Sequence, residues 1–139
     1  MKKIALVIGS LVFILFSAFC LADTFFQAEF MKPAEAEKKW GVKLLNKDLF
    51  RTGDQNKRES MAVDMVKKNI YVGKPMKLVR QELGEPDSYF FSDTIYAYKI
   101  MPFPGENKEN WHLVFIPDEN LENVKEVKIH KKCCYKLPF

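Results

Sequence analysis

The stretch from Gly73 to Asp87 has the sequence marks of one short helix with both ends defined. Pro75 suits the first helical position, where its missing N–H leaves no helical hydrogen bond unmade. Gly84 suits the residue after the last turn, where φ is often positive, and Pro86 prevents continuation. Between them, one apolar stripe recurs at spacings of three and four: Met76, Val79 and Leu83. A helix this short is not stable alone, so the sequence predicts that the stripe packs on another element.

The first 22 residues have the layout of a secretory signal peptide. Two lysines precede an apolar run over residues 4–16, and small residues follow up to Ala22. Cleavage after Ala22 makes Asp23 the first residue of the mature chain. Two alternatives stay open: lipidation at Cys20, and a membrane anchor, although a spanning helix needs roughly 20 apolar residues. We predict an exported protein of the periplasm or the outer membrane, with lipidation the less favoured form.

Charge and cysteine content limit the kinds of partner and fold that the rest of the chain can have. Removing Lys2 and Lys3 from the formal net charge of +4 leaves +2. Lysines and acids are interspersed rather than gathered in a stripe, which argues against nucleic acid as a partner. The two remaining cysteines, Cys133 and Cys134, are adjacent, and a disulfide between neighbours is strained. We therefore expect one domain that depends on its hydrophobic core and is monomeric when free.

Residues 23–55 are rich in aromatic and aliphatic side chains but have no clear period. The stretch from Pro33 to Lys39 has the composition of a short helix, and Gly41 and Gly53 interrupt the remainder. We interpret residues 23–55 as a partly irregular N-terminal arm whose aromatic residues pack on the domain. The alternative is an arm that anchors a partner, because aromatic side chains are favoured at interfaces.

A longer helix is predicted from about Asn56 to Asn69. Asn56 with Glu59 three residues later resembles a capping box. One face is apolar, as shown by two pairs of residues four apart: Met61 with Met65 and Ala62 with Val66. The side predicted to face water is charged: Arg58, Glu59, Lys67 and Lys68.

After Asp87 the apolar period becomes that of strands. We predict strands at residues 89–91, 94–101, 111–116 and 124–131, with a tight connection at Ser92-Asp93 and a loop over residues 102–110. One register of the last two strands forms an apolar face from Leu113 with Ile129 and Phe115 with Val127. The same register places two other pairs on the opposite face: His112 with His130 and Val114 with Lys128. A slip by one residue mixes the faces, whereas a slip by two stays open. The sequence therefore predicts an α+β fold with two helices on one face of a three- to four-stranded antiparallel sheet.

Several stretches together resemble one protein family: residues 58–65, residues 73–76 with Val79, residues 83–87, Tyr98, residues 111–115 and residues 127–129. They resemble the SmpA/OmlA (BamE-like) family of small envelope lipoproteins of Gram-negative bacteria. The most specific part is a structural motif, at Gly73, Val79, Leu83, Gly84, Pro86 and Asp87. The resemblance covers residues 56–131, which leaves residues 132–139 as a C-terminal tail.

The resemblance implies a non-enzymatic protein that supports outer-membrane assembly or envelope integrity through protein contacts. Tandem-repeat inhibitor proteins, of the β-lactamase-inhibitor-protein type, share a similar layout. Inhibition of an extracellular enzyme is therefore the alternative function.

The sequence has few of the residue patterns that are typical of catalysis. No Gly-rich phosphate loop, HExxH or paired CxxC occurs, so we predict no catalytic residue and no cofactor. The weak candidates for a soft-metal cluster are His112, His130, Cys133 and Cys134. We interpret the histidines as surface residues and the cysteines as a free or mixed-disulfide tail.

The predicted binding residues lie in and beside the loop before residue 111: Pro102, Phe103, Pro104, Gly105 and Trp111. Loops carry function on rigid scaffolds, whereas Trp111 and Tyr98 have a second interpretation as core residues. Lysines in the tail are candidates for contact with anionic lipid: Lys131, Lys132 and Lys136. The predicted partner is a protein of the cell envelope.

Overall fold

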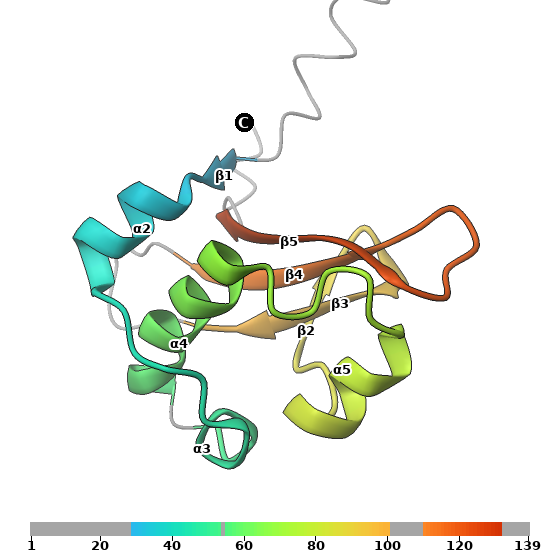
Figure 1. Cartoon of the computed structure of the whole chain (residues 1–139), viewed down its shortest axis with the longest axis horizontal. Coiled ribbons are helices and arrows are strands. Elements are labelled where there is room, and N and C mark those ends of the chain that lie inside the picture. The colour runs from blue at the N-terminus through green and yellow to red at the C-terminus, as the bar shows by residue number, and fades with distance from the viewer. Residues whose placement is uncertain (1–28, 54, 101–109, 132–139) are drawn as a thin grey trace, which may run out of the picture.

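The computed structural model describes residues 29–53, 55–100 and 110–131. These residues form one five-stranded antiparallel sheet in the order β1-β5-β4-β3-β2 (Figure 1). The strands are β1 (Glu29–Met31), β2 (Ser88–Phe90), β3 (Ser92–Lys99), β4 (Trp111–Pro117) and β5 (Val124–Lys131). The helices are α2 (Pro33–Trp40), α3 (Lys47–Arg51), α4 (Gln55–Lys68) and α5 (Met76–Leu83). The predicted α+β class is confirmed.

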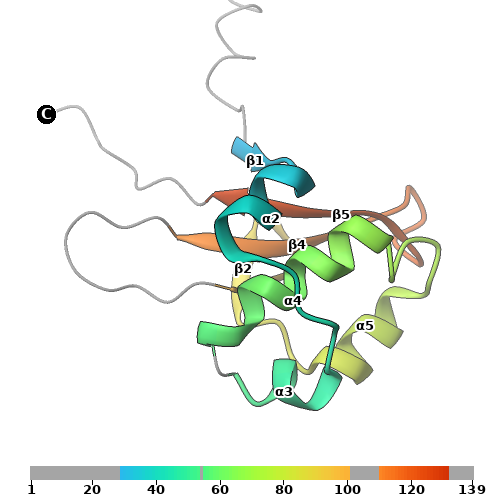
Figure 2. The same cartoon turned by 60° about the vertical axis from the view of Figure 1, so that its left-hand side comes forward.

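The element count was predicted too low, because the described part of the chain has five strands and four helices. A short helix predicted over residues 33–39 is confirmed as α2, but β1 and α3 were not foreseen. They have three and five residues, too few to establish a period. Figure 2 shows α2, α4 and α5 on the same side of the sheet. From Glu29 onward the arm is thus built into the domain.

The predicted register of β4 and β5 is confirmed. Leu113 pairs with Ile129 and Phe115 with Val127, and all four side chains are buried. Because side chains alternate along a strand, these residues share the face that receives the helices. The slip by two residues is excluded, and a bulge ends the regular ladder between Ile116 and Pro117.

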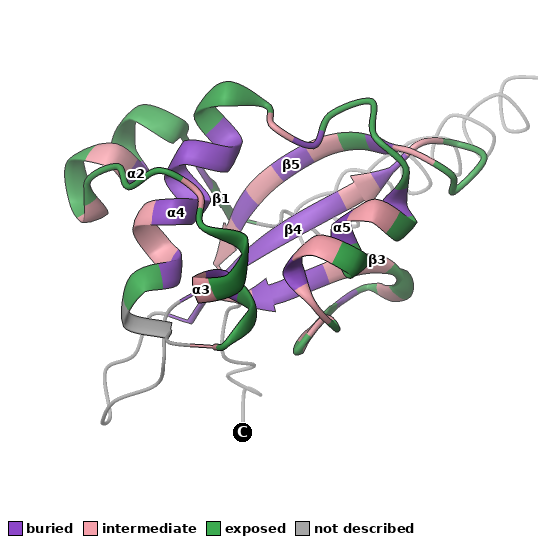
Figure 3. Cartoon of the chain, turned by 60° about the horizontal axis from the view of Figure 1, so that its bottom comes forward, coloured by how far each residue is buried: buried purple, intermediate pink, exposed green. Residues whose placement is uncertain are grey.

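The core lies between this face and the apolar stripes of α4 and α5, which bury Met61, Met65, Val79 and Leu83. A row of four rings crosses it in edge-on contacts with centroids 5.6 to 5.7 Å apart: Tyr71, Phe115, Tyr98 and Phe50. Figure 3 shows these helices turning buried residues toward the sheet and exposed residues outward. The stripe predicted for α5 is confirmed.

Three boundary predictions were wrong. Pro75 is the N-cap of α5 rather than its first residue, with φ −57° and ψ 137°. The helix α4 begins at Gln55, so Asn56 lies inside it and is not its cap. The chain turns at Phe91, which has φ +56°, and the predicted turn residues Ser92 and Asp93 already belong to β3. In each case the boundary shifts by one or two residues, as is usual for element ends read from sequence.

Gly84 ends α5, as predicted, with φ +88° and ψ −174°, a region that is essentially restricted to glycine. Its N–H donates to Arg80 O at 3.0 Å. A Cβ atom at this position would lie 3.0 Å from Cγ of Arg51, whose guanidinium donates to the carbonyls of Gln81 and Glu82. Glycine is therefore required both by the backbone and by the packing of Arg51.

We expect Gly84→Ala to lower the free energy of unfolding by about 1–3 kcal/mol, because alanine is strained in this backbone region. Gly41 provides the matched control, since it has φ +69° and ψ −172° and a Cβ there meets nothing within 4 Å. Gly41→Ala carries the backbone cost alone, so the smaller loss is expected there. Urea denaturation measures both, and an equal loss would mean that Arg51 adds nothing.

Candidate binding surface

An aromatic patch covers part of the sheet face that points away from the described helices. Its members are linked by ring contacts: Phe30, Phe90, Phe91 and His130. The ring centroids of Phe30 and Phe90 are 6.0 Å apart, although their strands stand at opposite ends of the sheet order. His130 lies against both rings, with centroids 4.5 Å from Phe90 and 5.5 Å from Phe30. The twisted sheet therefore brings its two edge strands together on this side.

Two members of the patch are exposed to solvent: Phe91 at 59% and Phe30 at 38%. Phe90 is buried beneath them and touches Phe91 at a centroid distance of 4.6 Å. Nζ of Lys128 lies 5.0 Å from the Phe30 ring centroid, which is within cation–π range. The patch thus presents apolar rings with a cation at one border.

Phe91 holds its ring at the surface in a left-handed conformation, with φ +56°. This conformation is uncommon for a bulky side chain and costs roughly 1–2 kcal/mol. Glycine is the residue that adopts it without strain. The turn between β2 and β3 therefore bears a cost for a side chain that it leaves exposed.

A buried polar network lies on the same side of the sheet. Nε2 of His112 is 2.9 Å from Oδ1 of Asn110, an oxygen that only accepts, so Nε2 carries the proton. Nδ1 on the other side of the ring hydrogen-bonds the hydroxyl of Ser88 at 2.7 Å. His112 is 0% exposed, so its interpretation as a surface residue was wrong. The alternation rule placed it on the correct face, but that face is covered by β2.

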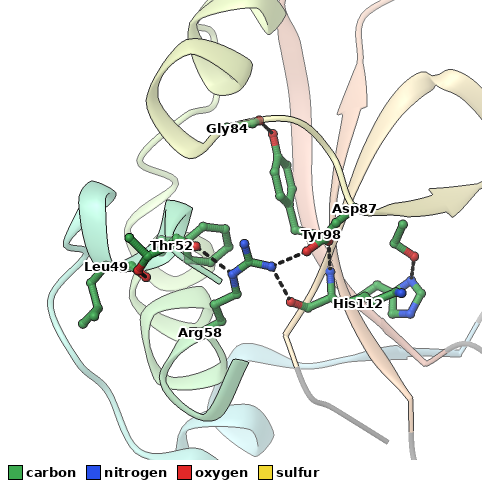
Figure 4. Close-up of polar contacts among 10 residues, drawn as sticks. Leu49, Thr52, Arg58, Gly84, Asp87, Tyr98 and His112 are labelled. Atoms are coloured by element: carbon green, nitrogen blue, oxygen red, sulfur yellow. Dashed lines mark hydrogen bonds and ion pairs between the residues drawn. The ribbon is translucent and has the colours of Figure 1, made fainter. Parts of the chain in front are cut away.

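On the helix side, Arg58 is only 3% exposed, which overturns the prediction that it faces water. Figure 4 shows its guanidinium directed at Asp87. Its Nε donates to Phe50 O at 2.7 Å, and its Nη1 donates to Asp87 Oδ2 at 2.6 Å and to Lys99 O at 3.1 Å. Asp87 Oδ1 in turn accepts from Lys99 N at 2.7 Å. These four residues, the Arg58 cluster, join α3, α4, β3 and the turn before β2.

Sequence reasoning missed the Arg58 cluster, yet a signal was present. Arg58 precedes Met61, Ala62 and Met65 at spacings of three, four and seven, which places it on the buried face of the helix. Asp87 was predicted only as part of a structural motif. The pairing of the two depends on contacts 29 residues apart, which no local pattern contains.

Two buried tyrosines border the same core. Burial raises the pKa of Tyr71 far above its usual value, and the hydrogen bond from its hydroxyl to Glu82 at 2.8 Å raises it further. Burial likewise raises the pKa of Tyr98, whose hydroxyl donates to Gly84 O at 2.8 Å. Glu82 is also 2.6 Å from Nζ of Lys47, and this contact lowers the pKa of its carboxyl.

The predicted binding residues separate into two groups. The residues from Pro102 to Gly105 lie outside the described residues. Trp111 is buried against Trp40 in an edge-on contact at 5.7 Å, which favours its interpretation as a core residue. Of the lysines considered for lipid contact, Lys131 lies over the Trp111 ring at 5.7 Å, and Lys132 and Lys136 are outside the described residues.

The structural motif is found around α5. Gly73 and Gly84 have positive φ, Val79 and Leu83 are buried, and two further members occupy the turn before β2: Pro86 and Asp87. Tyr98 is in the core.

The weak metal candidates are only partly described. His112 and His130 are cross-strand neighbours, but both ring nitrogens of His112 are engaged with Ser88 and Asn110. Cys133 and Cys134 lie outside the described residues. Within residues 29–53, 55–100 and 110–131, no group of three or more metal-ligating side chains is close enough to hold an ion.

None of the helices in the described part of the chain is long and apolar enough to cross a membrane. No protein-family model matches the chain, and comparisons with curated proteins and with solved structures found no similar protein.

Proposed function

We propose that this protein is an exported, non-enzymatic binding module of the cell envelope. It supports outer-membrane assembly or envelope integrity by contacting another protein through the aromatic patch. The observation that carries the proposal is the joint exposure of Phe30 and Phe91, whose rings both lie against Phe90 on the face away from the described helices. Aromatic side chains are the commonest anchors of protein interfaces, and exposed apolar surfaces of this kind mark sites of interaction.

The resemblance of the sequence to the SmpA/OmlA (BamE-like) family adds to this proposal. The resemblance implies two helices with an antiparallel sheet of three or four strands, and the chain order of α4, α5 and then β2 to β5 supports it. We propose a BamE-like domain over residues 56–131 on this basis. Export rests on the signal-like pattern of residues 1–22.

The polar network supports a role without covalent chemistry. Ser88, His112 and Asn110 have the hydrogen-bond order of a nucleophile, a base and an orienting group. A base in an active site must also reach a substrate, and the His112 ring is fully buried. We therefore assign the network to holding β2 on the sheet.

Site-specific photo-crosslinking in intact cells tests the proposal. A benzophenone amino acid replaces Phe91 in one variant and Leu121 in the matched control, an aliphatic residue that is 54% exposed in another turn. We expect a crosslinked envelope protein from position 91 and none from position 121. Mass spectrometry of the purified chain identifies the N-terminus, with Asp23 expected as its first residue.

The outcomes separate the alternatives. Recovery of a secreted enzyme from position 91 would favour the inhibitor function over envelope assembly. Equal products from both positions, or none from position 91, would contradict binding through the aromatic patch.

A further inference from the structure

The outer edge of β5 has a gap between the two segments that pair with it. At one end, β1 pairs with residues Ile129 to Lys131. At the other end, Val124 exchanges hydrogen bonds of 2.8 Å with Gly73 and Lys74 in the connection before α5. Among the described residues, no strand lies opposite residues 125–128 on this side. Four strand residues correspond to a gap of about 13 Å.

The backbone of Val127 points into this gap. The N–H of Ile100 donates to Trp111 O at 3.1 Å, so the backbone groups of Trp111 face β3. The direction of the backbone N–H and C=O groups alternates along a strand. The groups of Val114 therefore face β5, where Val114 pairs with Lys128. One residue earlier on β5, the N–H and C=O of Val127 face the outer edge. The gap thus holds a donor and an acceptor in the spacing that an added strand uses.

An open hollow of about 670 Å³ lies beside the gap. Its floor is apolar, since Met31, Val66 and Val127 are all buried, and the start of α2 at Pro33 and Ala34 forms one wall. We call the hollow and the adjacent edge of residues 125–128 the β5 groove. An apolar side chain that entered the groove would leave water for a lining of the same polarity.

The lysines at the rim of the β5 groove differ in their ion pairs. Lys67 pairs with Glu37 at 2.6 Å, and Lys128 pairs with Glu126. Lys32, which also lines the hollow, has no ion pair with any residue that the structure describes. A carboxylate is the group that complements it.

We propose that the β5 groove binds an extended peptide segment of another protein by strand addition. The segment continues the line of β1, and its backbone hydrogen-bonds the N–H and C=O of Val127. One apolar side chain fills the hollow, and a neighbouring Asp or Glu meets Lys32. The short gap selects a segment of about four residues, and the outward N–H and C=O of Val127 require it to be extended. This site goes beyond the proposed function, because it shares only Phe30 with the aromatic patch.

Selection from a random heptapeptide library displayed on phage tests the proposal on the processed chain. The library is first depleted on the Ala34→Trp variant, whose indole blocks the hollow and whose fold is checked by circular dichroism. Peptides then retained by the unmodified chain should share an apolar residue beside Asp or Glu. At saturation, a synthetic copy should slow amide hydrogen exchange at Val127 by about tenfold or more.

Matched variants assign the site. Lys32→Glu is expected to weaken peptide binding about tenfold, whereas Lys77→Glu makes the same charge change on α5 and should leave binding unchanged. Phe91→Ala should also leave it unchanged, which separates this site from the aromatic patch. The proposal is overturned if no peptide survives depletion or if exchange at Val127 is unaffected. It is also overturned if a synthetic peptide of residues 132–139 protects Val127 better than the selected peptides, since the chain would then be its own ligand.

Discussion

Arg58→Ala is expected to lower the free energy of unfolding by about 3–5 kcal/mol, because a buried side chain that makes charge-assisted hydrogen bonds to several acceptors is lost. The guanidinium serves three acceptors at once, and the substitution leaves the carbonyls of Phe50 and Lys99 without it. It also removes the contact with the Phe50 ring, whose centroid lies 4.7 Å from Cζ. Urea denaturation followed by circular dichroism measures the loss.

Arg80→Ala is the matched control for this prediction. Arg80 is also a helical arginine paired with an acid, Glu85, but its side chain is 52% exposed. Exposed pairs contribute little, so we expect a change within about 0.5 kcal/mol. Arg58→Lys should fall between the two, because an ammonium group keeps the charge and cannot serve acceptors in three directions with fixed geometry. Similar losses for Arg58→Ala and Arg80→Ala would contradict the structural role assigned to the cluster.

A double-mutant cycle separates the ion pair from the other contacts. Asp87→Ala removes the partly exposed partner of the ion pair. It also removes the carboxylate that accepts a hydrogen bond from the N–H of Lys99. We expect a coupling energy of about 0.5–3 kcal/mol between positions 58 and 87, since the two side chains are in direct contact. A coupling energy near zero would assign the whole effect of Arg58 to the carbonyls and the Phe50 ring.

Local signals in the sequence were enough for the elements that carry strong ones. Gly84 has no side chain to oppose its backbone conformation, so its position at the end of α5 could be predicted from chemistry alone. The register of β4 and β5 could also be predicted, because a slip by one residue would turn Leu113 and Phe115 away from the core. These features depend on neighbours in the chain or on the strict alternation of a strand.

The candidate binding surface depends on contacts that are distant in the sequence and could not be predicted. Phe30 and Phe90 meet because β1 and β2 approach each other over one face, and the pattern that predicts β2 contains no sign of this contact. From the sequence, His112 is interpreted as a surface residue, because histidine is polar and its two neighbours in the strand are apolar. Its burial follows from the position of β2, which depends on the whole sheet. The predicted binding loop at residues 102–110 lies almost entirely outside the described residues and stays a prediction.

Raising the pH above 10 is expected to destabilise the protein by an amount set by Tyr71 and Tyr98. Both side chains are fully buried, and burial raises the pKa of each phenol well above 10 in the folded protein. In the unfolded chain the same groups ionise near pH 10. Above this pH the unfolded state loses protons that the folded state keeps, so alkali favours unfolding.

The expected slope follows from this proton difference. Each tyrosine lowers the free energy of unfolding by about 1.4 kcal/mol per pH unit once the pH exceeds 10, and the pair lowers it by about 2.7 kcal/mol. The contribution is fully present below pH 10 and disappears progressively above it. Urea denaturation at a series of pH values between 8 and about 11 measures the slope, and ultraviolet absorbance reports whether the two phenols ionise before or with unfolding.

The double variant Tyr71→Phe with Tyr98→Phe tests the cause of this slope. At pH 8 it should be less stable by about 1 kcal/mol for each hydrogen bond lost, to Glu82 and to Gly84 O. Above pH 10 it should lose stability more slowly than the unmodified protein, because phenylalanine has no proton to release. The two stability curves must therefore converge as the pH rises. Parallel curves would mean that the loss of stability above pH 10 comes from the lysines. The buried phenols would then ionise as easily in the folded protein as in water.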